Sequence, residues 1–266
     1  MSLVFFLALQ VADLPRSLGA FQDGEGTRVV DPHSEEDHTA TNPANLQRLA
    51  AIFDQYEHLD LDDRSVYRNI LNLRYAEPFA GGDMSFRITA PFVATDVGPS
   101  RESGFGDLAL RYTWVPLNAE KFGIVLVLDA FLDTASHDVL GRGKDSLAPQ
   151  ITFEYYVSPQ VIVATAYQHN VSVAGDDERR DINEGYLDLY GVYTSADKLR
   201  WVTLTATLIL DYENHSQSGI VEAEFGMILV PVSRADLSIF VTPGVGVGEE
   251  RFFDWSIQLG LRLVGF

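Results

Sequence analysis

The last fourteen residues, 253–266, alternate between apolar and polar side chains. Every odd position from Phe253 to Leu263 is apolar, and the even positions between them are small or polar: Asp254, Ser256, Gln258, Gly260 and Arg262. Successive side chains of a strand point to opposite faces, so one face suits an apolar phase and the other a polar one. A strand of this length that ends on an aromatic residue is typical of the closing strand of a membrane-spanning barrel. Phe266 lies one residue out of register, which we attribute to a bulge at Gly265.

The same alternation recurs from Ser65 onward and is clearest between Trp201 and Leu210. It predicts eleven strands, near 66–76, 83–93, 106–116, 121–133, 149–157, 161–171, 184–194, 200–212, 219–231, 236–246 and 253–265. Short connections alternate with longer polar ones, as they do in outer-membrane barrels with short periplasmic turns and long extracellular loops. Because such barrels have an even number of strands, one more strand should precede Val66, either at 48–58 or near 26–30. We therefore predict an all-β, antiparallel transmembrane barrel of about twelve strands, with ten as the fallback.

The N-terminal part lacks this alternation. We interpret residues 1–20 as the remnant of a signal peptide because 3–12 is a short apolar run; since no Lys or Arg precedes the run, a mis-set start or a real first strand also fits. Residues 21–62 are predicted to form an extension with a helix near 43–59, in which Asn42 is the N-cap and Pro43 the first helical residue. The helix would cap the periplasmic end or lie in the lumen as a plug, and the barrel would span 63–266.

Composition narrows the classes of function. Cysteine is absent, which excludes disulfide scaffolds, thiolate catalysis and thiolate metal sites. The net charge of −19 argues against nucleic acid as a partner. The chain contains no run of about eighteen apolar residues, so a transmembrane helix is not indicated. Aromatic residues near strand ends fit the girdles of a membrane barrel: Tyr67, Tyr75, Phe92, Trp114, Tyr155, Tyr193, Trp201, Tyr212, Phe253 and Trp255.

The polar face of the predicted strands would line the lumen. Its early positions are basic or polar: Arg68, Asn72, Arg74, Arg87 and Arg111. Its later positions are acidic: Asp129, Asp133, Glu154, Asp188, Glu222, Glu224 and Asp254. Opposing basic and acidic walls would orient dipolar solutes and select among ions, or the charges would simply pair to fill a narrow interior. Tyr156, Tyr186 and Tyr190 would add an aromatic lining.

Neither catalytic nor metal chemistry is indicated. His137 and His215 fall in predicted loops beside serines, but adjacent residues do not form a Ser–His pair, and His169 has no evident partner. No histidine spacing points to a transition-metal site, and no cofactor is required.

Three segments resemble a bacterial outer-membrane family assigned to the meta-cleavage pathway of phenol degradation: 68–75, 86–93 and 104–112, of which only the Gly104-Phe-Gly106-Asp107 motif is distinctive. The resemblance implies an outer-membrane channel that takes up aromatic or other small hydrophobic compounds. The motif lacks the third glycine and the helix of a nucleotide loop, so we expect a tight entry into a strand.

Together these features predict a passive channel in the outer membrane of a Gram-negative-type bacterium, with outer-membrane lipid and a small solute as partners. An outer-membrane lipid hydrolase and a structural or interaction barrel with a sealed lumen are the alternatives.

Overall fold

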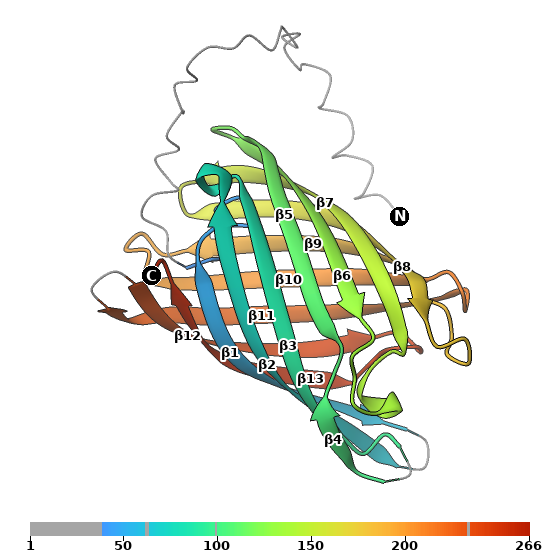
Figure 1. The fold of residues 1–266 in the computed structure, drawn as a ribbon. Helices are drawn as coiled ribbons and strands as arrows, with labels where there is room; N and C mark the ends of the chain where they lie inside the picture. Colours follow the sequence, from blue (N-terminus) through green and yellow to red (C-terminus); the bar gives the residue numbers. More distant parts are fainter. Residues whose placement is uncertain (1–38, 62–63, 99, 233–234) are drawn as a thin grey trace, which may run out of the picture. The chain divides into compact units, whose positions relative to one another are not determined.

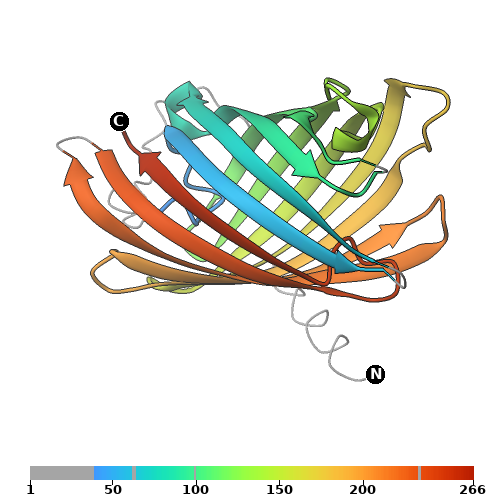
Figure 2. The same cartoon turned by 90° about the horizontal axis from the view of Figure 1, so that it is seen from below.

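The fold is one antiparallel sheet that closes on itself. The computed structural model describes residues 39–61, 64–98, 100–232 and 235–266. The strands are β1 (Leu49–Asp60), β2 (Ser65–Phe79), β3 (Met84–Thr95), β4 (Glu102–Phe105), β5 (Leu108–Asn118), β6 (Phe122–Leu132), β7 (Lys144–Ser158), β8 (Val161–Gly175), β9 (Asn183–Thr194), β10 (Arg200–Asp211), β11 (Ser216–Val232), β12 (Ala235–Val247) and β13 (Trp255–Val264). Two short 3₁₀ turns, η1 (Ala80–Gly82) and η2 (Asp138–Leu140), lie between strands. Figures 1 and 2 show the strands inclined and wrapped around a common lumen.

Pairing of the first strand with the last closes the barrel. β1 pairs with β13 from Leu49 opposite Val264 to His58 opposite Trp255, and its other edge pairs with β2 along its whole length. In Figure 2 the blue strand β1 lies between the red strand β13 and the cyan strand β2. No strand edge is therefore left open between the first strand and the last, which is the requirement for a sheet that spans lipid.

The barrel has twelve strands, as predicted. Thirteen strand segments are present, but β4 and β5 together form one strand of the wall. β4 pairs with residues 92–95 of β3, and β5 pairs with residues 84–89 of the same strand. The break between them falls at Gly106 and Asp107.

Every connection at one end of the barrel is short: those between β2 and β3, β5 and β6, β7 and β8, β9 and β10, and β11 and β12. The other end has two short connections, β1 to β2 and β10 to β11, together with all the longer ones. We call the first of these the turn end and the second the loop end.

The predicted helix near 43–59 is wrong. Residues 49–60 form β1, so the barrel begins at Leu49 rather than at residue 63, and the alternative of a first strand at 48–58 is confirmed. The sequence hid this strand because its outward face carries Asp54, which accepts a hydrogen bond from Asn69 on β2 at 2.9 Å. Its inward face mixes Phe53 with Glu57, so neither face is purely apolar or polar. Residues 1–20 and 21–38 of the predicted signal remnant and extension lie outside the described residues.

Large apolar side chains cover the outer face of the barrel. They alternate with inward residues along the strands, and Leu189 and Leu204 each leave 59% of their surface exposed. On β13 the outward residues are Trp255, Ile257, Leu259 and Leu261, so the alternation that predicted this strand is confirmed from Trp255 onward. Such a broad apolar surface suits contact with lipid. Among the residues that the structure describes, none belongs to a helix long and apolar enough to cross a membrane.

Two of the predicted girdle residues do not face outward. Phe253 precedes β13 and is 3% exposed, and Trp201 is 2% exposed inside the barrel. The indole Nε1 of Trp201 donates a hydrogen bond to Glu224 at 2.6 Å, which satisfies a polar group that burial would otherwise leave unpaired. Gly226 opposes Trp201 in the β10–β11 register and leaves room for the ring, since a Cβ atom there would lie 2.0 Å from Cζ2 of Trp201.

Phe266 returns to the outer face by a turn rather than by a bulge within the strand. Gly265 follows the last paired residue and has a φ of 78°, a conformation that glycine adopts without strain. Its N–H donates a hydrogen bond to the carbonyl oxygen of Arg48 at 2.9 Å. The Phe266 ring then lies 6.4 Å from the ring of Tyr75, between centroids, on the outward face of β2.

We expect Gly226→Ala to destabilise the barrel by about 1–3 kcal/mol, because the added methyl group overlaps the rigid indole of Trp201. Urea unfolding of the protein in lipid vesicles measures this change. Gly191→Ala is the matched control on a neighbouring pair of strands, since its Cβ would approach no atom closer than 3.9 Å. Equal unfolding midpoints for the two variants would contradict the assigned position of Trp201.

Candidate functional site

Residues 39–47 lie inside the turn end of the lumen. Ala44 is buried against Val115, Val125 and Val127, which face inward from β5 and β6. Nη1 of Arg262 on β13 donates a hydrogen bond to the carbonyl oxygen of Thr39 at 2.8 Å. This part of the predicted extension does not form the helix that was expected.

Four arginines gather beside this segment. Arg87 on β3 lies opposite Arg111 on β5. Ala51 on β1 lies opposite Arg74 on one neighbouring strand, β2, and opposite Arg262 on the other, β13. Arg74, Arg87 and Arg111 are thus predicted lumen residues that the fold brings together. Arg262 was missed as a site residue, although its even position in the closing strand already placed it on the polar face.

Two of these arginines have carboxylate partners. Arg111 binds Asp129 in a bidentate ion pair, with N–O distances of 2.6 and 2.7 Å, and Gln168 also donates to Asp129 at 2.7 Å. Arg262 lies 3.4 Å from Glu224. Pairing across neighbouring strands therefore accounts for part of the predicted charge pattern.

Arg74 and Arg262 are also stacked on aromatic rings. The guanidinium of Arg74 lies 4.6 Å from the centroid of Phe53, and that of Arg262 lies 4.7 Å from Phe240 and 5.6 Å from Trp201. Attraction between a guanidinium and a ring face holds the side chain while leaving its N–H edges available. The aromatic cluster thus fixes where the cations lie in the lumen.

The remaining predicted lumen residues on strands occupy other parts of the wall. Arg68 pairs with Glu57 at 2.6 Å near the loop end. Asp188 accepts a hydrogen bond from Thr207 at 2.6 Å, and Tyr156 donates one to Glu154 at 3.1 Å near the turn end. Four more predicted lumen residues alternate along their strands with outward apolar residues: Asn72, Tyr186, Tyr190 and Glu222. Asn72 is buried, and the other three are partly exposed to solvent.

Asp133 and Asp254 are not on the lumen strands. Asp133 follows β6 in an exposed loop, where partial desolvation of its carboxyl, and then the negative charge of Asp107, raise its pKa. Asp254 precedes β13 and accepts hydrogen bonds from the backbone N–H of Asp60 at 2.5 Å and from Arg251, which lower the pKa of its carboxyl. His58, Asp60 and Asp254 have ligand atoms within 4.8 Å of one another, but these bonds already engage Asp254.

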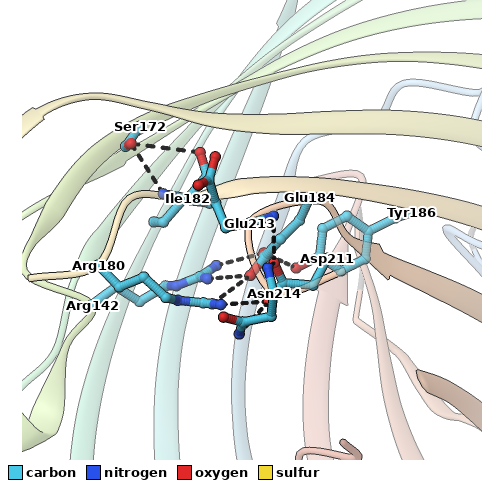
Figure 3. Close-up of polar contacts among 9 residues, drawn as sticks. All are labelled: Arg142, Ser172, Arg180, Ile182, Glu184, Tyr186, Asp211, Glu213 and Asn214. Carbon is cyan, nitrogen blue, oxygen red and sulfur yellow. Dashed lines mark hydrogen bonds and ion pairs between the residues drawn. The ribbon is translucent and has the colours of Figure 1, made fainter. Parts of the chain in front are cut away.

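A cavity of about 820 Å³ occupies the loop end, and an ion cluster around the buried carboxylate of Glu184 lies at its wall. Figure 3 shows Arg142 and Arg180 directed toward Glu184. Arg142 binds both carboxylate oxygens of Glu184, with distances of 2.5 and 2.9 Å, and Tyr186 donates to the same carboxylate at 2.6 Å. Burial opposes the charge of Arg142, but its bonds to Glu184 outweigh burial and raise its pKa. Arg180 bridges this cluster to Asp211 at 2.5 Å.

This cluster was missed by the sequence reading. Arg142 lies in the loop between β6 and β7, where no periodicity reports which way a side chain points. Glu184 lies at the start of β9 and is 1% exposed, so its inward direction could be read from the alternation but its partner could not.

The Gly104–Asp107 motif lies where β4 ends and β5 begins. Gly106 is buried at the break between β4 and β5, and a Cβ there would lie 2.9 Å from Val93. The carboxylate of Asp107 accepts hydrogen bonds from the backbone N–H groups of Ala135 at 3.2 Å and Arg142 at 2.6 Å. Asp107 thereby ties the loop that carries Arg142 to the barrel wall.

The three histidines considered for catalysis, His137, His169 and His215, lie in loops or on the outer side of the barrel. His169 is on the outer side of β8, where its ring lies 5.6 Å from Tyr212 and its Nδ1 is 3.3 Å from the Tyr167 hydroxyl. His137 and His215 are in loops between strands. Within the described ranges, no hydrogen bond joins a serine to a histidine.

We expect Asp107→Ala to loosen the loop between β6 and β7, because two backbone N–H groups lose their acceptor. Losing hydrogen bonds to a charged acceptor costs about 1–3 kcal/mol, so trypsin cleavage after Arg142 should become about tenfold faster or more. Asp138→Ala, an exposed change on the same loop, is the control. Equal cleavage rates would contradict the anchoring role of Asp107.

No family model and no curated protein matches this chain. Solved structures do match. An outer membrane channel from Pseudomonas putida F1 is 12% identical with a TM-score of 0.64, and the match covers 87% of this chain and 98% of the channel. A KdgM porin in complex with disordered oligogalacturonate and the NanC porin are each 11% identical, with TM-scores of 0.54 and 0.53, over 82% of this chain and 99% of theirs.

At these identities the likeness concerns the fold. The resemblance to the phenol meta-cleavage family is not confirmed by any of these matches. The chain has the closed β-barrel fold of outer-membrane channels and porins.

Proposed function

We propose that this protein is a passive outer-membrane channel for small solutes. The observation that carries the proposal is a lumen lined with charged and hydroxyl side chains, hollowed by a cavity of about 820 Å³, inside a wall whose outer face is apolar. A polar interior beneath an apolar belt is the arrangement through which water-soluble molecules cross lipid.

The barrel ends give the path a direction. Long loops face outward and short turns face the periplasm in outer-membrane barrels, so the loop end would be extracellular. Solute would enter the loop-end cavity, pass the Arg142–Glu184 cluster and reach the arginines at the turn end. Residues 39–47 would narrow or gate the exit, because they lie in the lumen beside those arginines.

The lumen charges would set selectivity. Arg74, Arg87 and Arg111 lie on adjoining strands β2, β3 and β5, whereas Asp188, Glu222 and Glu224 lie on β9 and β11. Opposing walls of this kind orient dipolar solutes across the passage. The ion pairs of Arg111 and Arg262 reduce that field without removing it.

Aromatic or other small hydrophobic compounds are the solutes that the sequence resemblance suggests. Tyr186 and Tyr190 alternate with outward leucines on β9, and Phe53, Trp201 and Phe240 form an aromatic cluster inside the barrel. These rings could contact a solute that has an apolar part. The related fold of a porin solved with oligogalacturonate supports a solute-binding role for a barrel of this kind.

A planar-bilayer experiment tests the channel. We expect the full chain to conduct weakly and a chain lacking residues 1–47 to conduct more, because the lumen segment is gone. Arg48 is kept in the shortened chain, since its carbonyl oxygen accepts the Gly265 N–H and its side chain binds Glu77.

A chain lacking only residues 1–38 is the matched control, because it keeps the lumen segment. Its conductance should equal that of the full chain. If neither the full chain nor the chain lacking residues 1–47 conducts, the channel proposal fails and a sealed structural barrel takes its place.

A further inference from the structure

A second cavity, of about 330 Å³, lies between residues 40–49 and the arginine cluster. All four arginines line it: Arg74, Arg87, Arg111 and Arg262. Among the described residues that line it, none is a carboxylate. Glu154, an acidic residue beside Gly123 and Ala44, lies outside that lining.

The cavity has more positive charge than its surroundings neutralise. Asp129 pairs with Arg111 and Glu224 pairs with Arg262. Arg74 has a hydrogen bond to the Thr89 hydroxyl at 3.3 Å and a contact with the Phe53 ring, but no ion pair within the described part of the chain. Arg87 has neither an ion pair nor a hydrogen bond there, and it directly opposes Arg111.

Like charges placed opposite each other on neighbouring strands repel, and a low-dielectric surrounding strengthens the repulsion. An anion bound to Arg87 would relieve its repulsion with Arg111, and Arg74, which lines the same cavity without an ion pair in the described part of the chain, would bind that anion too. A planar guanidinium offers two parallel N–H groups, which match the two oxygens of a carboxylate.

The other walls of the cavity specify the rest of the ligand. Leu46, Val125 and Val127 form an apolar side, and Thr113, Thr152 and Tyr190 contribute hydroxyl groups. An inorganic anion would leave the apolar side in contact with water. A small organic acid would place its carboxylate on the arginines and its body against the leucine and valines.

We propose that this cavity is a binding site for a small organic carboxylate with an apolar body. The inference rests on the proposed channel function in one respect, which is that such acids would be its solutes. Binding itself requires only the folded barrel.

Isothermal titration of the full chain in detergent micelles tests the site, with benzoate as the probe. Benzamide has the same ring without the charge and should bind at least about tenfold more weakly, because it cannot form charge-assisted bonds with both arginines. Inorganic phosphate should also bind more weakly than benzoate. Benzamide that binds as well as benzoate, or phosphate that binds as well or better, would overturn the proposal.

Arg87→Gln should weaken benzoate binding about tenfold, because it removes a cation that the protein does not neutralise. Arg200→Gln changes an exposed arginine on β10 and should leave the affinity unchanged. Arg74→Gln gives a second test should the first variant fail to fold, as judged by heat-modifiable migration in gels. Unchanged benzoate affinity in a folded Arg87 or Arg74 variant would overturn the proposal.

The bilayer conductance described above separates the two proposals. A chain that binds benzoate but conducts nothing would overturn the channel and leave the site intact. A chain that conducts but does not bind benzoate would overturn the carboxylate site and leave the channel proposal intact.

Discussion

The structure depends on the hydrogen bonding of β1 to β13. In a hydrocarbon layer each unpaired backbone group costs several kcal/mol, so a sheet can cross only if its edges meet. Ten residue pairs along this seam, from Leu49 with Val264 to His58 with Trp255, meet that requirement. Closure then forces every strand to divide its side chains between an outer and an inner face, and the chemistry of the lumen follows from that division.

Closure also explains how a chain of net charge −19 comes to hold a basic cluster. Many acidic side chains lie in loops or form pairs, whereas Arg74, Arg87, Arg111 and Arg262 come from strands that are neighbours around the seam and just beyond it. Arg262 and Arg74 are far apart in sequence, but β1 places both beside Ala51. The aromatic rings beneath them and the glycines that accommodate those rings keep the guanidinium groups in place.

Alternation predicted the strands well because it reports one simple contrast, lipid against lumen. It therefore identified β2, β3 and β5 through β13, with the lumen positions of Arg74, Arg87 and Arg111, and the even number of strands in such barrels then gave the total of twelve. The short strand β4 was missed. It failed where a face is mixed: Asp54 points outward on β1, and Phe53 points inward, so the strand resembled a helix. Trp201 was misplaced for a related reason, because an aromatic residue near a strand end can face either phase when a glycine opposite it leaves space. A contact such as that of Arg142 with Glu184 cannot be predicted from alternation, because it depends on how a loop folds back over the end of the barrel.

Residues 39–47 have a further consequence for the order of assembly. None of them takes part in the pairing of β1 with β13 or with β2, which begins at Leu49 and is extended only by the bond from the Gly265 N–H to the Arg48 carbonyl oxygen. The segment can thus enter the lumen after the seam has closed, and leave it again, without breaking a strand pair. Barrel formation and lumen occupancy are then two separate steps with separate free energies, the first governed by backbone pairing and the second by the contacts of Ala44 and Thr39.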